Sequence, residues 1–179
     1  MIALFAALTA IGSIITIPIG PVPITLQNIF PMLAGLILGS EAGAMSQLIY
    51  VLLGIVGLPV FAGGTGGINS VFSPSFGYLL GFILAAFIIG KISEKAGKLT
   101  LIKSFIICII GTIIIYLIGI PYLYIILHNV LGEKITIAYA IKIGFVLFIP
   151  GDIFKIIVVS FITNKVVPLL RRQSLIESK

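Results

Sequence analysis

Charged residues are scarce in this sequence, and their scarcity excludes an ordinary soluble protein. Only 9% of the 179 residues are charged, 60% are hydrophobic, and the mean hydropathy is +1.32. In soluble domains about a quarter of the residues are charged. We therefore expect an integral membrane protein embedded in a lipid bilayer, built as a single domain over residues 1–179. This length accommodates about six membrane helices of roughly 20 residues each.

Cysteine and histidine are almost absent as well. Cys108 and His128 are each the only residue of their kind. The chain can therefore form no internal disulfide, and His128 has no companion at a spacing suited to a metal site. The H-E-x-x-H, G-x-S-x-G and G-x-x-x-x-G-K-[ST] motifs are missing too. These absences argue against an enzyme and against a nucleotide-binding protein, and no cofactor is expected.

The basic residues indicate how the chain is oriented in the membrane. The net charge is +6, and the Lys and Arg residues cluster in two places, at Lys91–Lys103 and from Lys165 to Arg172. Such clusters mark cytoplasmic segments, and no basic stripe of a nucleic-acid-binding module accompanies them. With both clusters inside, six crossings place both termini in the cytoplasm.

Hydrophobic segments separated by glycine, proline or charged residues predict an all-α membrane protein with six transmembrane helices. The first segment lacks the features of a cleaved signal peptide and is expected to remain as a membrane helix. Pro150 should open the last helix, because proline suits a first helical turn. The predicted spans are residues 2–17, 24–38, 42–58, 75–91, 101–127 and 150–170, with a partly inserted or lateral helix at 135–149.

Three unusual segments meet near the outer face in this topology. They are the proline-rich stretch 18–27, a glycine-rich loop at about 59–74, and the first turn of the last helix. Irregular backbone at membrane depth is tolerated only where it is buried in protein or lines a cavity. The sequence therefore predicts a binding pocket that opens to the outside.

Asp152 and Lys155 are the main candidates for binding a ligand. They are three residues apart in the last hydrophobic segment and so share one helix face. Ionisable residues inside a bilayer are costly and usually functional. The carboxylate could accept N–H donors of a urea or amide, and the ammonium could pair with a ligand carboxylate or carbonyl. The alternative is a self-neutralising structural pair, with Asp152 favoured by the helix N-terminus.

The glycine-rich loop supplies further candidates. Four glycines occur within Gly63–Gly67, and glycine permits positive φ and a close approach of backbone to ligand. Gly64 is therefore expected to contact the ligand, while Asn69 and Ser70 supply polar groups. The alternative is a flexible outer loop without a binding role.

Two polar residues at helix positions are weighed in the same way. Gln27 lies just inside an apolar helix, and a buried amide needs hydrogen-bond partners. Gln27 is therefore a candidate for ligand contact. The alternative is that its segment only marks and caps the start of the helix. Tyr78 on the fourth helix is a weaker ligand candidate, and so is Gln47 on the third.

The first helix carries two pairs of small residues at a spacing of four. The pairs are Ala3 with Ala7 and Ala6 with Ala10. Small residues at this spacing let helices approach closely. They serve either packing within the chain or docking of a partner subunit.

Together these segments resemble the BioY family, the biotin-specific S components of energy-coupling-factor (ECF) transporters. The resemblance covers nearly the whole chain in order. It departs at Ser75-Phe76, where Thr-Gly is expected after the proline, and this departure concerns local loop packing. The matching stretches are Pro21–Gln27, Leu33–Gly39, Gly57–Gly64, Ser73–Tyr78 and Phe148–Lys155.

The resemblance implies a six-helix protein of the prokaryotic plasma membrane that captures biotin. It implies as partners a transmembrane coupling subunit and two cytoplasmic ATPase subunits. By the same resemblance Asp152, Lys155 and Asn69 contact biotin, and the alanine pairs of the first helix dock the coupling subunit.

Biotin has a ureido ring system, a thioether and a valerate tail, which suit an apolar pocket with few polar groups. Asp152 is expected to accept the ureido N–H groups, and the end of biotin that meets Lys155 is left open. The alternative is a self-sufficient transporter or channel for biotin or another small solute, which would favour a polar path reaching both faces.

Overall fold

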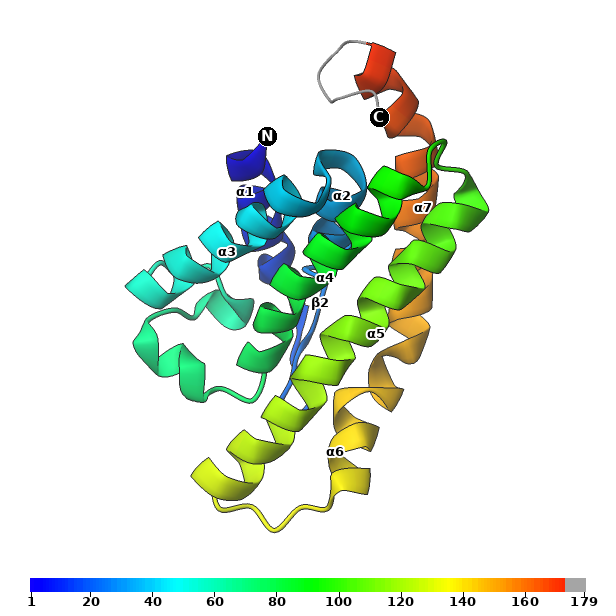
Figure 1. Cartoon of the computed structure of the whole chain (residues 1–179). Coiled ribbons are helices and arrows are strands. Elements are labelled where there is room, and N and C mark those ends of the chain that lie inside the picture. The colour runs from blue at the N-terminus through cyan, green and yellow to red at the C-terminus, as the bar shows by residue number, and fades with distance from the viewer. Residues whose placement is uncertain (173–179) are drawn as a thin grey trace.

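Helices make up most of the structure, a computed structural model that describes residues 1–172 (Figure 1). The α-helices in this part of the chain are α1 (Ile2–Ile14), α2 (Ile29–Leu38), α3 (Ser40–Val56), α4 (Phe76–Lys95), α5 (Leu101–Ile125), α6 (Ile137–Gly144) and α7 (Ile149–Arg172). Strands β1 (Thr16–Ile17) and β2 (Ile24–Thr25) pair antiparallel, with Thr16 opposite Thr25. A π-helical turn, Ile126–Val130, extends α5, and short 3-10 turns lie at Ala62–Gly64, Ile68–Phe72 and Val146–Phe148.

The all-α class is confirmed, and α1–α5 and α7 follow the six predicted segments in order. A helix also lies within the segment 135–149, as α6 at Ile137–Gly144, and its lateral or partly inserted position in the membrane stays a prediction. The backbone breaks at Phe145, whose φ is −135° and ψ −59°, before α7 begins at Ile149 with Pro150 in its first turn. Proline fits there because the first helical N–H groups have no intrahelical acceptor to lose.

The boundaries of the first two helices differ from the prediction. α1 ends at Ile14 and not Ile17, and α2 begins at Ile29 and not Ile24. The residues between them include three prolines, at positions 18, 21 and 23. Proline fixes φ and donates no backbone hydrogen bond, so it favours extended segments over helix. The flanking residues pair as the β1–β2 hairpin instead.

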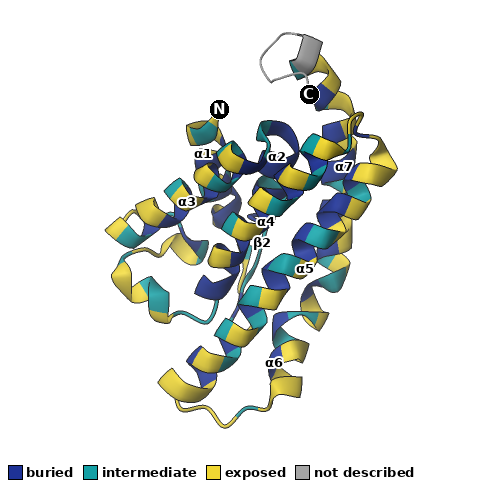
Figure 2. Cartoon of the chain, in the orientation of Figure 1, coloured by how far each residue is buried: buried dark blue, intermediate teal, exposed yellow. Residues whose placement is uncertain are grey.

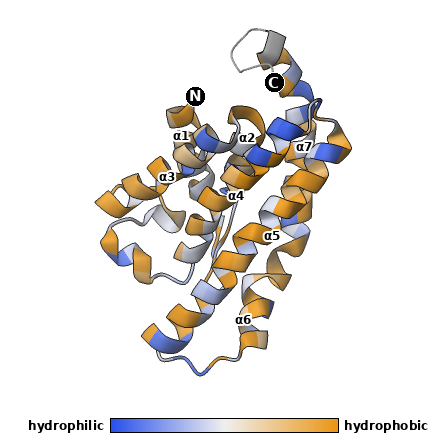
Figure 3. Cartoon of the chain, in the orientation of Figure 1, coloured by the Kyte–Doolittle hydropathy of each residue, from blue (hydrophilic) through white to orange (hydrophobic). Residues whose placement is uncertain are grey.

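Within residues 1–172, three helical stretches are long and apolar enough to cross a membrane, namely Phe76–Lys95, Leu101–Val130 and Ile137–Leu170. The helices α1, α2 and α3 are shorter, with 13, 10 and 17 residues. At 1.5 Å per residue α2 spans about 15 Å, roughly half of a 30 Å hydrocarbon core. Most of the helical ribbon is coloured as hydrophobic in Figure 3, and many large apolar side chains are exposed, as lipid contact requires.

Helix α4 lies at the centre and packs against α2, α3 and α5. Close backbone approach explains part of this packing: a Cβ on Gly35 of α2 would lie only 2.6 Å from the carbonyl oxygen of Ala86 in α4. Met32, Ala85 and Ile89 are fully buried at this centre. Figure 2 shows buried residues on the inward faces of the helices and exposed residues on their outward faces.

The two basic clusters predicted to be cytoplasmic lie at one end of the molecule. The N-terminus, the α4–α5 turn and the C-terminal part of α7 lie together at the top of Figure 1, and the α5–α6 connection lies at the opposite end. Lys91, Lys95, Lys98 and Lys103 are exposed at the α4–α5 turn. The fold thus brings together the clusters that the sequence places on one side of the membrane.

The orientation itself remains a prediction, and cysteine labelling tests it. In a Cys108→Ala background, Lys98→Cys should react with a membrane-impermeant maleimide only in inside-out vesicles, and Glu133→Cys only in intact cells. Both positions are exposed, at opposite ends of α5, and basic turns stay in the cytoplasm. The unaltered chain is the control, because its fully buried Cys108 should not react. The reverse labelling pattern would invert the orientation.

Candidate functional site

A buried ion pair lies at the start of α7. Asp152 stands in the first turn of the helix and Lys155 one turn further, and each is only 4% exposed. The Lys155 ammonium lies 3.2 Å from Oδ1 of Asp152. Removing two charges from water costs several kcal/mol per ion, which mutual attraction offsets only when further hydrogen bonds satisfy both groups. The surroundings of Asp152 provide such bonds.

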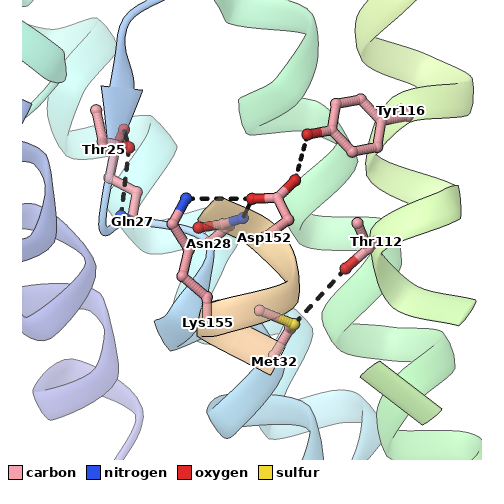
Figure 4. A network of polar contacts seen from close by, with 8 residues as sticks. All are labelled: Thr25, Gln27, Asn28, Met32, Thr112, Tyr116, Asp152 and Lys155. Carbon is pink, nitrogen blue, oxygen red and sulfur yellow. Dashed lines mark hydrogen bonds and ion pairs between the residues drawn. The ribbon is translucent and has the colours of Figure 1, made fainter. Parts of the chain in front are cut away.

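Two more donors converge on the Asp152 carboxylate (Figure 4). The Asn28 side-chain amide donates to Oδ1 at 2.9 Å, and the Tyr116 hydroxyl donates to Oδ2. Asn28 precedes α2 and Tyr116 belongs to α5, so one carboxylate joins three parts of the fold. Together with Lys155, these donors give the carboxylate three hydrogen bonds and fix its orientation.

A second polar chain connects the β1–β2 hairpin to the glycine-rich loop. Gln27 accepts a hydrogen bond from the Thr25 hydroxyl at 3.0 Å and donates one to the Tyr50 hydroxyl. Tyr50 in turn donates to the Val60 carbonyl oxygen at 3.1 Å. The buried amide of Gln27 is thus already hydrogen-bonded within the protein, and it holds together the two segments on either side of the cavity.

These groups surround a cavity of about 210 Å³. The hairpin, the glycine-rich loop, α4, α5 and the start of α7 all contribute to its lining. Its apolar wall consists mainly of aromatic and branched side chains, which suits the flat or cyclic part of a small ligand. That wall includes Phe61, Phe76, Leu79, Phe82, Ile115 and Phe148.

Five of the seven predicted ligand-contacting residues line this cavity: Asp152, Lys155, Gln27, Ser70 and Tyr78. The Tyr78 hydroxyl also donates to the Gly144 carbonyl oxygen at 2.8 Å, which ties α4 to the break after α6. The ligand contacts of all five remain predictions.

The other two predicted residues, Asn69 and Gly64, are exposed and lie outside the cavity lining. Their ligand contacts also remain predictions, and contact would require the loop to move. Gln47 is buried away from the cavity, where its side-chain oxygen accepts a hydrogen bond from Thr9 at 3.2 Å and links α3 to α1.

The two alanine pairs of α1 face different surroundings. Ala3 and Ala7 are exposed, whereas Ala6 is buried and Ala10 is half-buried against the core. The Ala6–Ala10 spacing therefore serves packing within the chain. Only the Ala3–Ala7 face is open to a partner, and docking there stays a prediction.

Sequence reasoning missed four residues of the site. Tyr50 accepts a hydrogen bond from Gln27, and Asn28, Thr112 and Tyr116 line the cavity. A signal existed for Tyr116, because it is the only polar residue of Ile113–Ile118 and a buried tyrosine hydroxyl usually has a partner. Asn28 extends the polar stretch that ends at Gln27. Neither signal identifies Asp152 as the shared acceptor.

Comparison with known proteins identifies the family of this chain. The BioY family model matches residues 1–172. The chain is 45% identical over 172 residues to a probable biotin transporter BioY of Lysinibacillus sphaericus, covering 96% of this chain and 87% of that one. It is 40% identical over 159 residues to the biotin transporter BioY of Thermotoga maritima, covering 89% of each.

A solved structure agrees with these relatives. The crystal structure of the S-component for biotin from an ECF-type ABC transporter superposes with a TM-score of 0.79 at 32% identity, over 96% of this chain and 89% of that chain. Together with the apolar helices, these likenesses indicate a multi-pass protein of the prokaryotic plasma membrane. They also indicate a transporter component and not an enzyme.

Breaking the buried pair should destabilise the protein more than removing it entirely. We expect Lys155→Met to lower the free energy of unfolding by about 3–5 kcal/mol, because Asp152 keeps a buried charge without its cation. The double variant Asp152→Asn/Lys155→Met should recover most of that loss. Thermal unfolding in one detergent measures both, with Lys95→Met at an exposed position as the control. A double variant no more stable than Lys155→Met would show that the unpaired charge is not the cause.

Proposed function

The chain belongs to the BioY family, and we propose that it is the biotin-binding S component of an ATP-driven ECF-type uptake transporter. The observation that carries this proposal is the buried Asp152–Lys155 pair in a cavity whose wall is largely aromatic and aliphatic. Such a cavity offers a small ligand apolar contact together with a few oriented polar groups, which is how most small-molecule sites achieve specificity.

The hydrogen-bond capacity of Asp152 suits the ureido ring of biotin. Oδ1 already accepts from Asn28 and Lys155, whereas Oδ2 accepts only from Tyr116. A carboxylate oxygen accepts about two hydrogen bonds, so Oδ2 keeps room for one ureido N–H group. Lys155 uses one of its three N–H donors on Asp152 and can turn another to a ligand acceptor. The aromatic wall then packs against the fused rings.

Capture takes place from the outer face, and the glycine-rich loop closes over the bound vitamin. Gly63, Gly64 and Gly67 have positive φ values of 74°, 71° and 94°, a conformation that glycine adopts without strain. The loop can therefore change shape between Val60 and Val71, the residues whose carbonyl oxygens accept from Tyr50 and Tyr122.

Partner subunits supply the energy for transport. The chain has no P-loop motif, so ATP hydrolysis takes place on two cytoplasmic ATPase subunits that act through a transmembrane coupling subunit. The exposed Ala3–Ala7 face of α1 allows close helix packing against that coupling subunit.

Biotin binding to the detergent-purified chain tests the capture step. Calorimetry should show one tight site for the wild type. Binding should weaken about 10- to 100-fold in Asp152→Asn and Lys155→Ala, because each change removes a charged group that the ligand contacts, and a hydrogen bond to a charged group contributes about 1.5–3 kcal/mol. Lys134→Ala, at an exposed position outside the cavity, is the control and should bind like the wild type. A folded wild type that does not bind biotin would overturn the assignment.

Transport in vesicles tests the dependence on partners. Vesicles that contain this chain alone should bind biotin without accumulating it. Vesicles that also contain the coupling subunit and both ATPase subunits should accumulate biotin when ATP is supplied on the side of the membrane that carries the ATPases. The substitution Ala7→Leu places a large side chain on the exposed Ala3–Ala7 face of α1. It should reduce biotin accumulation and leave the Kd of the chain for biotin unchanged. Concentrative uptake by the chain alone would favour the self-sufficient transporter.

A further inference from the structure

Helix α4 has an exposed face that neither the cavity nor the Ala3–Ala7 face of α1 includes. We propose that this face binds one anionic phospholipid, with an acyl chain on its apolar part and the phosphate on its basic end. The inference rests on the geometry of α4 and is independent of biotin binding. The lipid stripe, as we name this face, consists of Leu80, Leu84, Phe87, Lys91, Lys95 and the adjoining Lys98.

Helical spacing aligns the five stripe residues that belong to α4. They follow one another at intervals of four, three, four and four residues, and at about 100° per residue they fall within a sector of about 80°. All five are exposed, whereas Phe82, Ala85 and Ile89 on the opposite side are buried. The stripe is thus one continuous surface on a helix whose other sides pack against α2, α3 and α5.

The stripe has the polarity of a phospholipid and the length of one leaflet. Its leucines and Phe87 are apolar, and the lysines follow them toward the end of α4 that Figure 3 shows as hydrophilic. From Leu80 to Lys91 the helix rises about 16 Å, which is close to half of a hydrocarbon core about 30 Å thick. An acyl chain along the apolar part therefore brings its phosphate to the lysines.

Lys91 is oriented for this role. Its Nζ atom lies 5.5 Å from the centroid of the Phe87 ring, and this contact holds the ammonium at the junction between the apolar and basic parts of the stripe. Lys103, in contrast, donates to the Ala96 carbonyl oxygen at 2.8 Å and closes the turn after α4. We therefore assign phosphate binding to the three stripe lysines and a structural role to Lys103.

One acid lies within this basic segment, and its carboxylate is directed to another helix. Glu94 is the only Asp or Glu among residues 91–103. Its Oε1 accepts hydrogen bonds from the Ser40 backbone N–H at 2.7 Å and from the Ser40 hydroxyl at 2.9 Å, at the start of α3. The four lysines and one acid give the segment a net charge of +3, which attracts an anion.

A phospholipid fits the whole stripe, whereas an acidic protein surface fits only its basic end. The stripe belongs to a helix that is long and apolar enough to cross a membrane, so Leu80, Leu84 and Phe87 lie where acyl chains are the ordinary neighbours. Basic clusters directly beside a membrane helix bind anionic lipid headgroups. Only a lipid combines an anion and an apolar chain in the order that the stripe presents.

Lipid binding to the purified chain in a neutral detergent tests the proposal. The probes are phosphatidylglycerol, which is anionic, and phosphatidylcholine with the same acyl chains, which has no net charge. Each lysine near an anionic headgroup contributes roughly fivefold in affinity, so the wild type should bind phosphatidylglycerol at least about tenfold more tightly. In Lys91→Gln/Lys95→Gln/Lys98→Gln this preference should fall below about threefold, because the lysines that create it are gone. Native mass spectrometry measures both affinities.

A matched control removes the same charge elsewhere on the chain. Lys134→Gln/Lys142→Gln/Lys165→Gln changes three exposed lysines outside the stripe, and it should keep the wild-type preference. Leu84→Ala should weaken binding of both lipids by a similar factor, because the acyl chain loses apolar contact. Glycerol phosphate, which has the anionic group without acyl chains, should not displace the bound lipid.

The inference is overturned if the wild type shows no preference, if the stripe variant keeps it, or if the control variant loses it equally, since net charge would then be the cause. Displacement by glycerol phosphate, or unchanged lipid binding in Leu84→Ala, also overturns it, because the acyl chain would then not contribute. A stripe variant that keeps its lipid preference and no longer co-purifies with the coupling subunit would assign the lysines to a protein partner. Thermal unfolding near the wild-type temperature shows that each variant is folded, so the test does not depend on the proposed function.

Discussion

The Asp152 carboxylate is the group on which the arrangement of the site depends. It is ionisable, 4% exposed and placed in a bundle with almost no other charge. Its three donors come from α7, from α5 and from the turn before α2. An unpaired charge in such a place would cost several kcal/mol, so these three elements must keep their mutual positions. The requirement to satisfy one buried charge thus fixes the deep part of the cavity.

Two tyrosine hydroxyls fix the glycine-rich loop, which lines another part of the cavity. The Tyr50 and Tyr122 hydroxyls donate to the Val60 and Val71 carbonyl oxygens, near the two ends of the glycine-rich loop. Gln27 joins the proline-rich hairpin to Tyr50. Backbone groups in a loop at membrane depth need partners, and these side chains provide them. The glycines between Val60 and Val71 keep conformational freedom, while both ends of the loop are tied to helices.

This division between a fixed frame and a loop with conformational freedom suits the capture role that we propose for the chain. Within residues 1–172 both buried charged side chains, Asp152 and Lys155, line one cavity, and many large apolar side chains are exposed on the outward faces of the helices. The chain has no motif for nucleotide hydrolysis. The family relationship and the likeness to the S-component for biotin of an ECF-type ABC transporter agree with a binding role without nucleotide hydrolysis. A binding subunit needs a specific site and a face for its partners, and the energy can come from other chains.

The sequence by itself determined the membrane class, the order of the helices, the position of Pro150 in the first turn of the last helix and the helix face that Asp152 and Lys155 share. All of these depend on local composition or on a spacing of three residues, which one helix converts directly into proximity. The family resemblance is likewise carried by short contiguous stretches.

Only the tertiary structure decided which distant residues meet. Asn28 and Asp152 are 124 positions apart, and no local periodicity predicts that contact. The fold also placed Asn69 outside the cavity lining, turned the Ala6–Ala10 spacing inward, and brought Ser73 and Ser75 into the cavity lining. The physical reason is that helical spacing determines the face on which a residue lies, whereas the packing of whole helices determines what that face meets.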